Sequence, residues 1–136
     1  MDLQNLGYAL TQVAHNFGAV AVLGGSLGAL WRSPQLESER VLGWLVCIGW
    51  AIQIASGSLF GAISFHYYGR FPDISGIAVM SLIIKVMCAS GGFFLAALYL
   101  WRAAAWRVAR RRRIWLTMSG LSAAALTAAA FLRWFS

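Results

Sequence analysis

Four long apolar stretches follow one another along the chain, and short polar segments separate them. The stretches cover about residues 6–31, 41–66, 75–101 and 114–135. Each exceeds the roughly 20 apolar residues that a helix needs to cross the hydrocarbon core of a bilayer. The segments between them are too short to hold a further folded unit. The pattern therefore predicts an all-α fold, a single transmembrane domain over residues 1–136 built as an antiparallel four-helix bundle.

The amino-acid composition places the chain in the same class. Hydrophobic residues make up 60% of the sequence and charged residues only 11%, whereas soluble domains carry about 25% charged residues. The chain begins MDLQNLG, with an acidic residue where a secretory signal peptide has basic ones. The first apolar stretch is also too long for the apolar part of such a peptide. We therefore expect it to remain as the first membrane span.

Arginine residues gather on two of the three connections. The first and third connections hold eight of them: Arg32, Arg40, Arg102, Arg107, Arg110, Arg111, Arg112 and Arg113. Only Arg70 and Arg133 lie on the other side. Basic residues favour the cytoplasmic side of a membrane, so the bias predicts a multi-pass protein of the cell inner membrane with both termini outside.

The tryptophan residues support this orientation and bear on the partners. Those expected at the cytoplasmic ends of the spans are Trp31, Trp44, Trp101, Trp106 and Trp115, and Trp134 is expected at an outer end. Tryptophan is enriched at both membrane interfaces, so this placement is typical of an aromatic belt. Membrane orientation and attraction to an anionic inner leaflet then explain the net charge of +7. No nucleic-acid partner is expected.

Small and weakly polar residues recur at helical spacing on one face of each stretch, which predicts that these faces pack together. Within those faces His15 and Lys85 are the ionisable residues that matter most, because Lys85 is the only lysine and lies inside an apolar run. Counting from the outer ends places both roughly 14 Å deep at about 1.5 Å per residue. Ser56 and Gly57 fall near the same level, which predicts a gap or a wall of small residues between His15 and Lys85. Such a gap could admit a ligand.

A lysine at the centre of a span costs about 3 kcal/mol to insert and usually marks a functional site. The acidic residues Asp2, Glu37, Glu39 and Asp73 are expected in connections or at the terminus, so no carboxylate is expected beside it. Lys85 is then neutral, solvated by a cavity, or paired with an anionic ligand. The structural alternatives are a lysine that extends to the interface and, for His15, a neutral ring bonded to a neighbouring helix.

Metal sites are weaker candidates. His15 and His66 could be axial haem ligands, but His66 lies at the outer end of its span, about 13 Å above His15 by helical rise. Met80, Met87 and Cys88 are soft donors that suit Cu(I), with His15 as a further possible ligand. They show no ligand motif, and methionine at helical spacing is usually core packing. Cys47 and Cys88 differ in depth, which argues against a disulfide.

Three segments carry a resemblance to known membrane proteins: HNFGAVAVLGG, SGSLFGAISF and SLIIKVMCASGGFFLAAL. They resemble the four-helix core of the copper-resistance protein D-like family, in which a first-span histidine precedes paired glycines and a later span holds a lysine. They are also similar to the small membrane protoporphyrinogen oxidase. The resemblance implies that His15 and Lys85 serve a tetrapyrrole such as a haem-type porphyrin, with copper a lesser alternative.

Two functional hypotheses remain open. In the first, the protein holds a tetrapyrrole or a metal near the outer half of the membrane in a redox or transport role, with Lys85 pairing an anionic group, His15 acting as a ligand or proton carrier, and Ser56 beside them. In the second, it is a non-catalytic accessory subunit of a larger, respiratory-type membrane complex, or it forms a homo-oligomer. Bound chromophore would distinguish the two.

Overall fold

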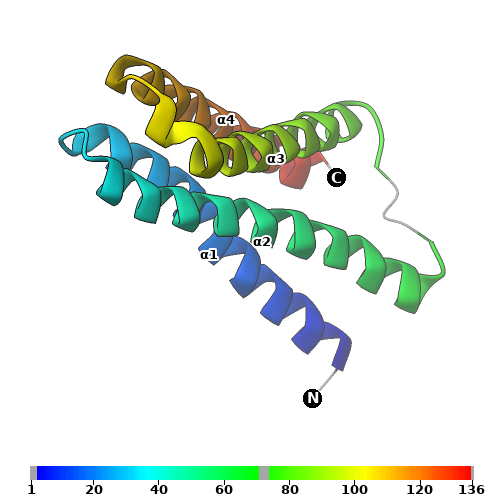
Figure 1. Ribbon diagram of the computed structural model, residues 1–136. Coiled ribbons are helices and arrows are strands. Elements are labelled where there is room, and N and C mark those ends of the chain that lie inside the picture. The colour runs from blue at the N-terminus through cyan, green and yellow to red at the C-terminus, as the bar shows by residue number, and fades with distance from the viewer. Residues whose placement is uncertain (1–2, 71–73, 136) are drawn as a thin grey trace.

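The computed structural model describes residues 3–70 and 74–135, and they form a bundle of four helices (Figure 1). The helices are α1 (Leu3–Trp31), α2 (Leu36–Tyr68), α3 (Ile77–Arg102) and α4 (Val108–Phe135), and a short 3₁₀ turn, η1 (Ala103–Ala105), follows α3. All four α-helices are long and apolar enough to cross a membrane. The described part of the chain contains no strand. The prediction of an all-α fold with four helices of membrane-spanning length is therefore confirmed.

Two helices begin earlier than the hydropathy pattern predicts. Helix α2 begins at Leu36 and not near 41, so Glu37 and Glu39 lie in its first turn, where the helix dipole favours negative charge. Helix α4 begins at Val108 and not near 114, so the run Arg110–Arg113 is helical. Hydropathy places a boundary where charge begins, but the backbone hydrogen-bonded ladder continues past that point.

The helices pack as two pairs that close into a ring. Contacts are most extensive between α1 and α2 and between α3 and α4, and the ring is completed by contacts of α2 with α3 and of α1 with α4. The start of α2, the end of α3 and the start of α4 meet at one end of the bundle, which we call the arginine-rich end. The start of α1 meets the end of α2 at the opposite end, where Gln4 Nε2 donates a 2.7 Å hydrogen bond to Tyr68 Oη.

Helices α1 and α2 approach closely through two facing glycines. A Cβ atom on Gly18 would lie 3.1 Å from the carbonyl oxygen of Gly49, and one on Gly49 would lie 3.2 Å from the carbonyl oxygen of Gly18. Small residues at such crossings let the backbones of membrane helices come together. The packing role that the small-residue faces predict is therefore confirmed at this crossing.

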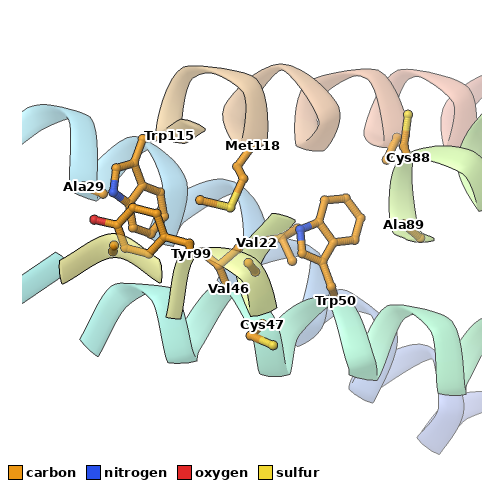
Figure 2. Close-up of a cluster of buried hydrophobic side chains, with 13 residues drawn as sticks. Val22, Ala29, Val46, Cys47, Trp50, Cys88, Ala89, Tyr99, Trp115 and Met118 are labelled. Carbon is orange, nitrogen blue, oxygen red and sulfur yellow. The ribbon is translucent and has the colours of Figure 1, made fainter. Parts of the chain in front are cut away.

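The large buried side chains lie between the arginine-rich end and the middle of the bundle (Figure 2). They are Val46, Trp50, Tyr99, Trp115 and Met118. Trp115 is only 1% exposed, so its expected place in an aromatic belt is wrong. Because α4 begins at Val108, Trp115 lies about two turns into the helix and packs on Tyr99 with ring centroids 4.9 Å apart. Trp31, Trp44, Trp101 and Trp134 remain exposed.

Candidate functional site

His15 of α1 and Lys85 of α3 meet inside the bundle. Lys85 Nζ lies 3.0 Å from His15 Nε2, a hydrogen-bonding distance, although the two residues are 70 positions apart in the sequence. Both side chains are half-buried. The common depth inferred from helical rise thus corresponds to a direct contact, and the gap expected between the two residues is absent because their side chains bridge it.

Ser56 of α2 completes a chain of three side chains. Its Oγ atom lies 2.7 Å from His15 Nδ1 and 2.5 Å from the carbonyl oxygen of Ile52, one turn earlier in the same helix. A serine in a helix commonly bonds to the carbonyl four residues before it. Three of the four helices therefore each contribute one residue, and we call Ser56, His15 and Lys85 the lysine chain.

Gln53 is a fourth polar residue at this level, and the sequence pattern did not single it out. Its Nε2 atom donates a hydrogen bond to the backbone carbonyl oxygen of His15. Gly18 makes room for this amide, because a Cβ atom at Gly18 would lie 2.9 Å from Gln53 Nε2. Gln53 therefore fixes the backbone of α1 at the histidine, one helical turn from the serine that contacts the ring.

An aromatic ring limits where the imidazole can move. Phe60 of α2 meets the His15 ring edge to face with centroids 5.8 Å apart, and Tyr8 of α1 stacks on Phe60 with centroids 6.2 Å apart. Edge-to-face contacts of this kind add modest stabilisation to the area that they bury. The imidazole is therefore held by Ser56, Lys85 and Phe60.

A cleft of about 690 Å³ opens beside Lys85, bounded by α2, α3 and α4. Residues of mixed size line it: Trp50, Gln53, Ile54, Gly57, Ser58, Phe60, Gly61, Ile74, Leu82, Lys85, Val86, Ala89, Ser90, Ala125 and Leu132. The side chains that line it are apolar apart from one amine, one amide, two hydroxyls and the indole N–H of Trp50. His15 and Ser56 are not part of it, so they lie behind Lys85. The volume lies within the range of about 300–1,000 Å³ that is typical of small-molecule sites.

The residues considered for metal binding lie on different sides of their helix. Met87 is 69% exposed on the outside of α3, and two positions of an α-helix correspond to about 200° of rotation, so it faces away from Lys85. Cys88 is buried and carries a free thiol, as does Cys47. No group of three or more His, Cys, Asp or Glu residues that could hold a metal occurs in residues 3–70 and 74–135. His66 lies at the end of α2 with its ring against Tyr67.

A second polar group lies at the arginine-rich end, and sequence reasoning missed it. Arg111 Nε of α4 lies 3.0 Å from Glu39 Oε2 of α2, and Tyr99 of α3 donates its hydroxyl to the same oxygen. Glu39 is 4% exposed and Arg111 is 7% exposed. Placing Glu39 in a connection is therefore wrong. We call Glu39, Tyr99 and Arg111 the glutamate cluster.

The spacing of residues contains a signal that could have found this cluster. Glu39, Gly43, Val46 and Trp50 follow one another at intervals of four, three and four, and they are all buried on α2. Arg111, Trp115, Met118 and Ser122 repeat the same intervals on α4 and are buried too. Such intervals mark one face of a helix. Extending each apolar face by one turn past the hydropathy boundary would have placed both charges inside.

Comparison of the chain with protein-family models, with curated proteins and with solved structures finds no match in any of the three. Function therefore has to be inferred from the geometry of the site.

Proposed function

We propose that the protein is a multi-pass protein of the cell inner membrane, arranged as an antiparallel bundle with its arginine-rich end in the cytoplasm and both termini outside. Eight of the ten arginines lie in the two connections at that end and their flanking helix ends, and basic residues favour the cytoplasmic side. Figure 1 supports this arrangement, since the α1–α2 and α3–α4 connections are drawn at the same end. In this orientation the cleft beside Lys85 belongs to the outer half of the membrane.

We further propose that the cleft binds the anionic group of an amphipathic ligand, with Lys85 as its counter-charge and His15 as the proton partner of the lysine. One observation carries this proposal: the amine of Lys85 lines an apolar cleft, and its partner is an imidazole and not a carboxylate. Ionisable residues inside a membrane are costly and usually mark a ligand or proton site. The acidic residues of α2 cannot serve, because Glu39 is paired with Arg111 and Glu37 shares its first turn at the arginine-rich end.

A tetrapyrrole with carboxylate side chains is our first candidate for this ligand. The resemblance of the first three spans to the protoporphyrinogen oxidase and copper-resistance protein D-like proteins suggests it, and a planar apolar ring with acidic arms suits a cleft with one amine. Lys85 would hold a carboxylate. Metal ligation by His15 is less well supported, because its two ring nitrogens already lie 2.7 Å from Ser56 Oγ and 3.0 Å from Lys85 Nζ. A haem iron or a copper ion would have to displace one of them.

The test is equilibrium binding of protoporphyrin IX and of its dimethyl ester to the purified full chain in detergent, followed by absorbance. We expect the free acid to bind and the ester to bind at least tenfold more weakly. Lys85→Met should bind the free acid as weakly as the ester. Lys85→Arg should retain part of the affinity for the free acid because the positive charge remains. Met87→Leu, on the exposed side of the same helix, is the matched control and should bind as the wild type does.

Equal binding of acid and ester, or full binding by Lys85→Met, would contradict the proposal. An accessory subunit or a homo-oligomer makes a different prediction for the same preparation. The native mass would then exceed that of one chain, and no porphyrin would bind specifically.

A further inference from the structure

The backbone carbonyl oxygen of Ile52, at the end of the lysine chain, determines which atom donates in each hydrogen bond of the chain. The carbonyl oxygen of Ile52 can only accept, and it lies 2.5 Å from Ser56 Oγ, so the single hydroxyl proton of Ser56 points there. Ser56 Oγ can then only accept from His15 Nδ1, 2.7 Å away. His15 therefore carries a proton on Nδ1, and the nitrogen that faces Lys85 is Nε2.

This assignment limits the charge of the pair. If the ring is neutral, Nε2 accepts a hydrogen bond from the Lys85 ammonium group. If the ring is charged, Nε2 donates to a neutral lysine amine. Both of these forms carry one positive charge, and a neutral amine that donates to a neutral ring gives a third form with none. The pair therefore carries at most one positive charge, because two positive charges across 3.0 Å repel each other strongly in an apolar surrounding.

Among the cleft-lining residues in the ranges 3–70 and 74–135, Lys85 is the only charged one. The residues that face the pair from α2 are Gln53, Ser56 and Phe60, which are neutral. The residues of α4 that line the cleft are Ala125 and Leu132, and the charged residues of that helix in the described range lie near its two ends, at Arg110–Arg113 and Arg133. The described lining of the cleft therefore offers at most one positive charge, that of Lys85 and its partner His15.

We infer that the part of the ligand that reaches Lys85 carries a single negative charge, as a carboxylate does, and that Ser56 is a positioning residue that fixes the tautomer of His15 and does not touch the ligand. This inference rests on the proposed function, since it names the charge of the ligand that the cleft takes.

The tautomer can be tested without any ligand. Because the sequence contains only two histidines, ¹⁵N-histidine labelling of the full chain in micelles gives two sets of ring signals, and His66→Gln assigns them. We expect the signals of His15 to show a protonated Nδ1, and Ser56→Ala to abolish this fixed pattern. Ser119→Ala removes a hydroxyl that bonds to its own helix at Trp115, and it should leave the His15 signals unchanged. A wild-type His15 protonated at Nε2 alone would overturn the assignment.

The charge selectivity is tested with two probes that share one apolar body, 1-pyrenebutyrate and the phosphate monoester of 1-pyrenebutanol, with tryptophan-to-pyrene energy transfer as the signal. The phosphate group is mostly monoanionic at pH 5.5 and mostly dianionic at pH 7.5, because its second pKa is about 6. If only the monoanion binds, the affinity for the phosphate probe should fall about twenty-five-fold over this range, as its monoanionic fraction does. The carboxylate should bind as well or better at the higher pH, and Lys85→Met should weaken both.

The outcomes separate the two proposals. A dianionic phosphate that binds as tightly as the carboxylate would overturn the single-charge inference while leaving the cleft as an anion site. If neither probe binds to the wild type, the proposed function fails and the ligand assignment fails with it, whereas the role of Ser56 is decided by the histidine signals alone.

Discussion

The glutamate cluster and the lysine chain are both polar groups inside an apolar bundle, and they differ in how their charges are met. In the glutamate cluster, Glu39 and Arg111 are almost completely buried and oppose each other at 3.0 Å, and Tyr99 bonds to the same carboxylate oxygen. In the lysine chain, the partner of Lys85 among the described residues is an imidazole, and a cleft of about 690 Å³ lies beside it. The charges of the glutamate cluster neutralise each other, whereas the described residues place no opposite charge beside Lys85.

The difference indicates which group serves stability and which serves function. A buried ion pair that is closed on itself ties α2, α3 and α4 together, although it adds little net stability compared with apolar packing. An intramembrane charge without an opposite charge has a cost that packing does not offset, so it indicates a ligand or a proton site. Substitutions in the two regions should therefore change different measured quantities.

The largest effect is expected at the glutamate cluster. Glu39→Gln keeps the shape of the side chain but leaves Arg111 buried without its counter-charge, and removal of one partner of a buried pair costs about 3–5 kcal/mol. Unfolding of the purified protein in detergent by heat or by SDS measures the loss. Glu37→Gln changes an exposed carboxylate in the same helical turn and should have little effect.

A double substitution tests the cause of that loss. Glu39→Gln combined with Arg111→Met removes both charges, and it should recover most of the stability because no unpaired charge remains buried. If the double variant is as unstable as Glu39→Gln, the ion pair is not what the single substitution disturbs.

A smaller effect is expected where the core meets the cleft. A Cβ atom on Gly92 would lie 2.3 Å from Trp50 Cε2, so Gly92→Ala must displace an indole that is buried in the core and also lines the cleft. Overpacking of this kind costs about 1–3 kcal/mol, and we expect a loss of porphyrin affinity with it. Gly91→Ala places its Cβ 3.9 Å from Leu121 Cδ1, an ordinary contact, and should be tolerated in both assays.

The smallest effect on stability is expected at Lys85, where a substitution should stabilise the protein slightly or leave its stability unchanged. Lys85→Met removes a charge that costs about 3 kcal/mol to place in a membrane span, so the variant should unfold at the same temperature as the wild type or higher. Its binding of anionic ligands should be lost. A strong destabilisation by this substitution would instead make Lys85 part of the framework of the bundle.

The sequence predicted the lysine chain better than the glutamate cluster, for a physical reason. His15, Ser56 and Lys85 lie deep in three spans, where helical rise is regular and depth can be counted from the ends. Glu39 and Arg111 lie at helix ends, where hydropathy falls before the helix stops, so the predicted boundaries excluded them. The number of spans follows from the lengths of the apolar stretches, and the inward faces follow from helical periodicity.

Side-chain detail at the site lay beyond sequence reasoning. The bond from Gln53 to the backbone of His15 depends on a rotamer and on the close crossing at Gly18. The cleft opens between α2, α3 and α4 beside Lys85, whereas the small residues at Ser56 and Gly57 predicted a gap between His15 and Lys85. Which side of a lysine is open depends on how the helices are rotated about their axes, and periodicity does not fix that rotation finely enough.

One measurement tests the separate roles of the two regions most directly: the melting temperature of the wild type, Glu39→Gln and Lys85→Met in detergent, each with and without saturating protoporphyrin IX. A ligand that binds the folded state raises its stability by about 2.7 kcal/mol at a hundred times its Kd. The account predicts that Glu39→Gln melts at a lower temperature but keeps the ligand-induced increase, and that Lys85→Met keeps its melting temperature but loses the increase. If both variants lose stability and the ligand-induced increase together, or if Lys85→Met retains that increase, the assignment of ligand binding to Lys85 is contradicted.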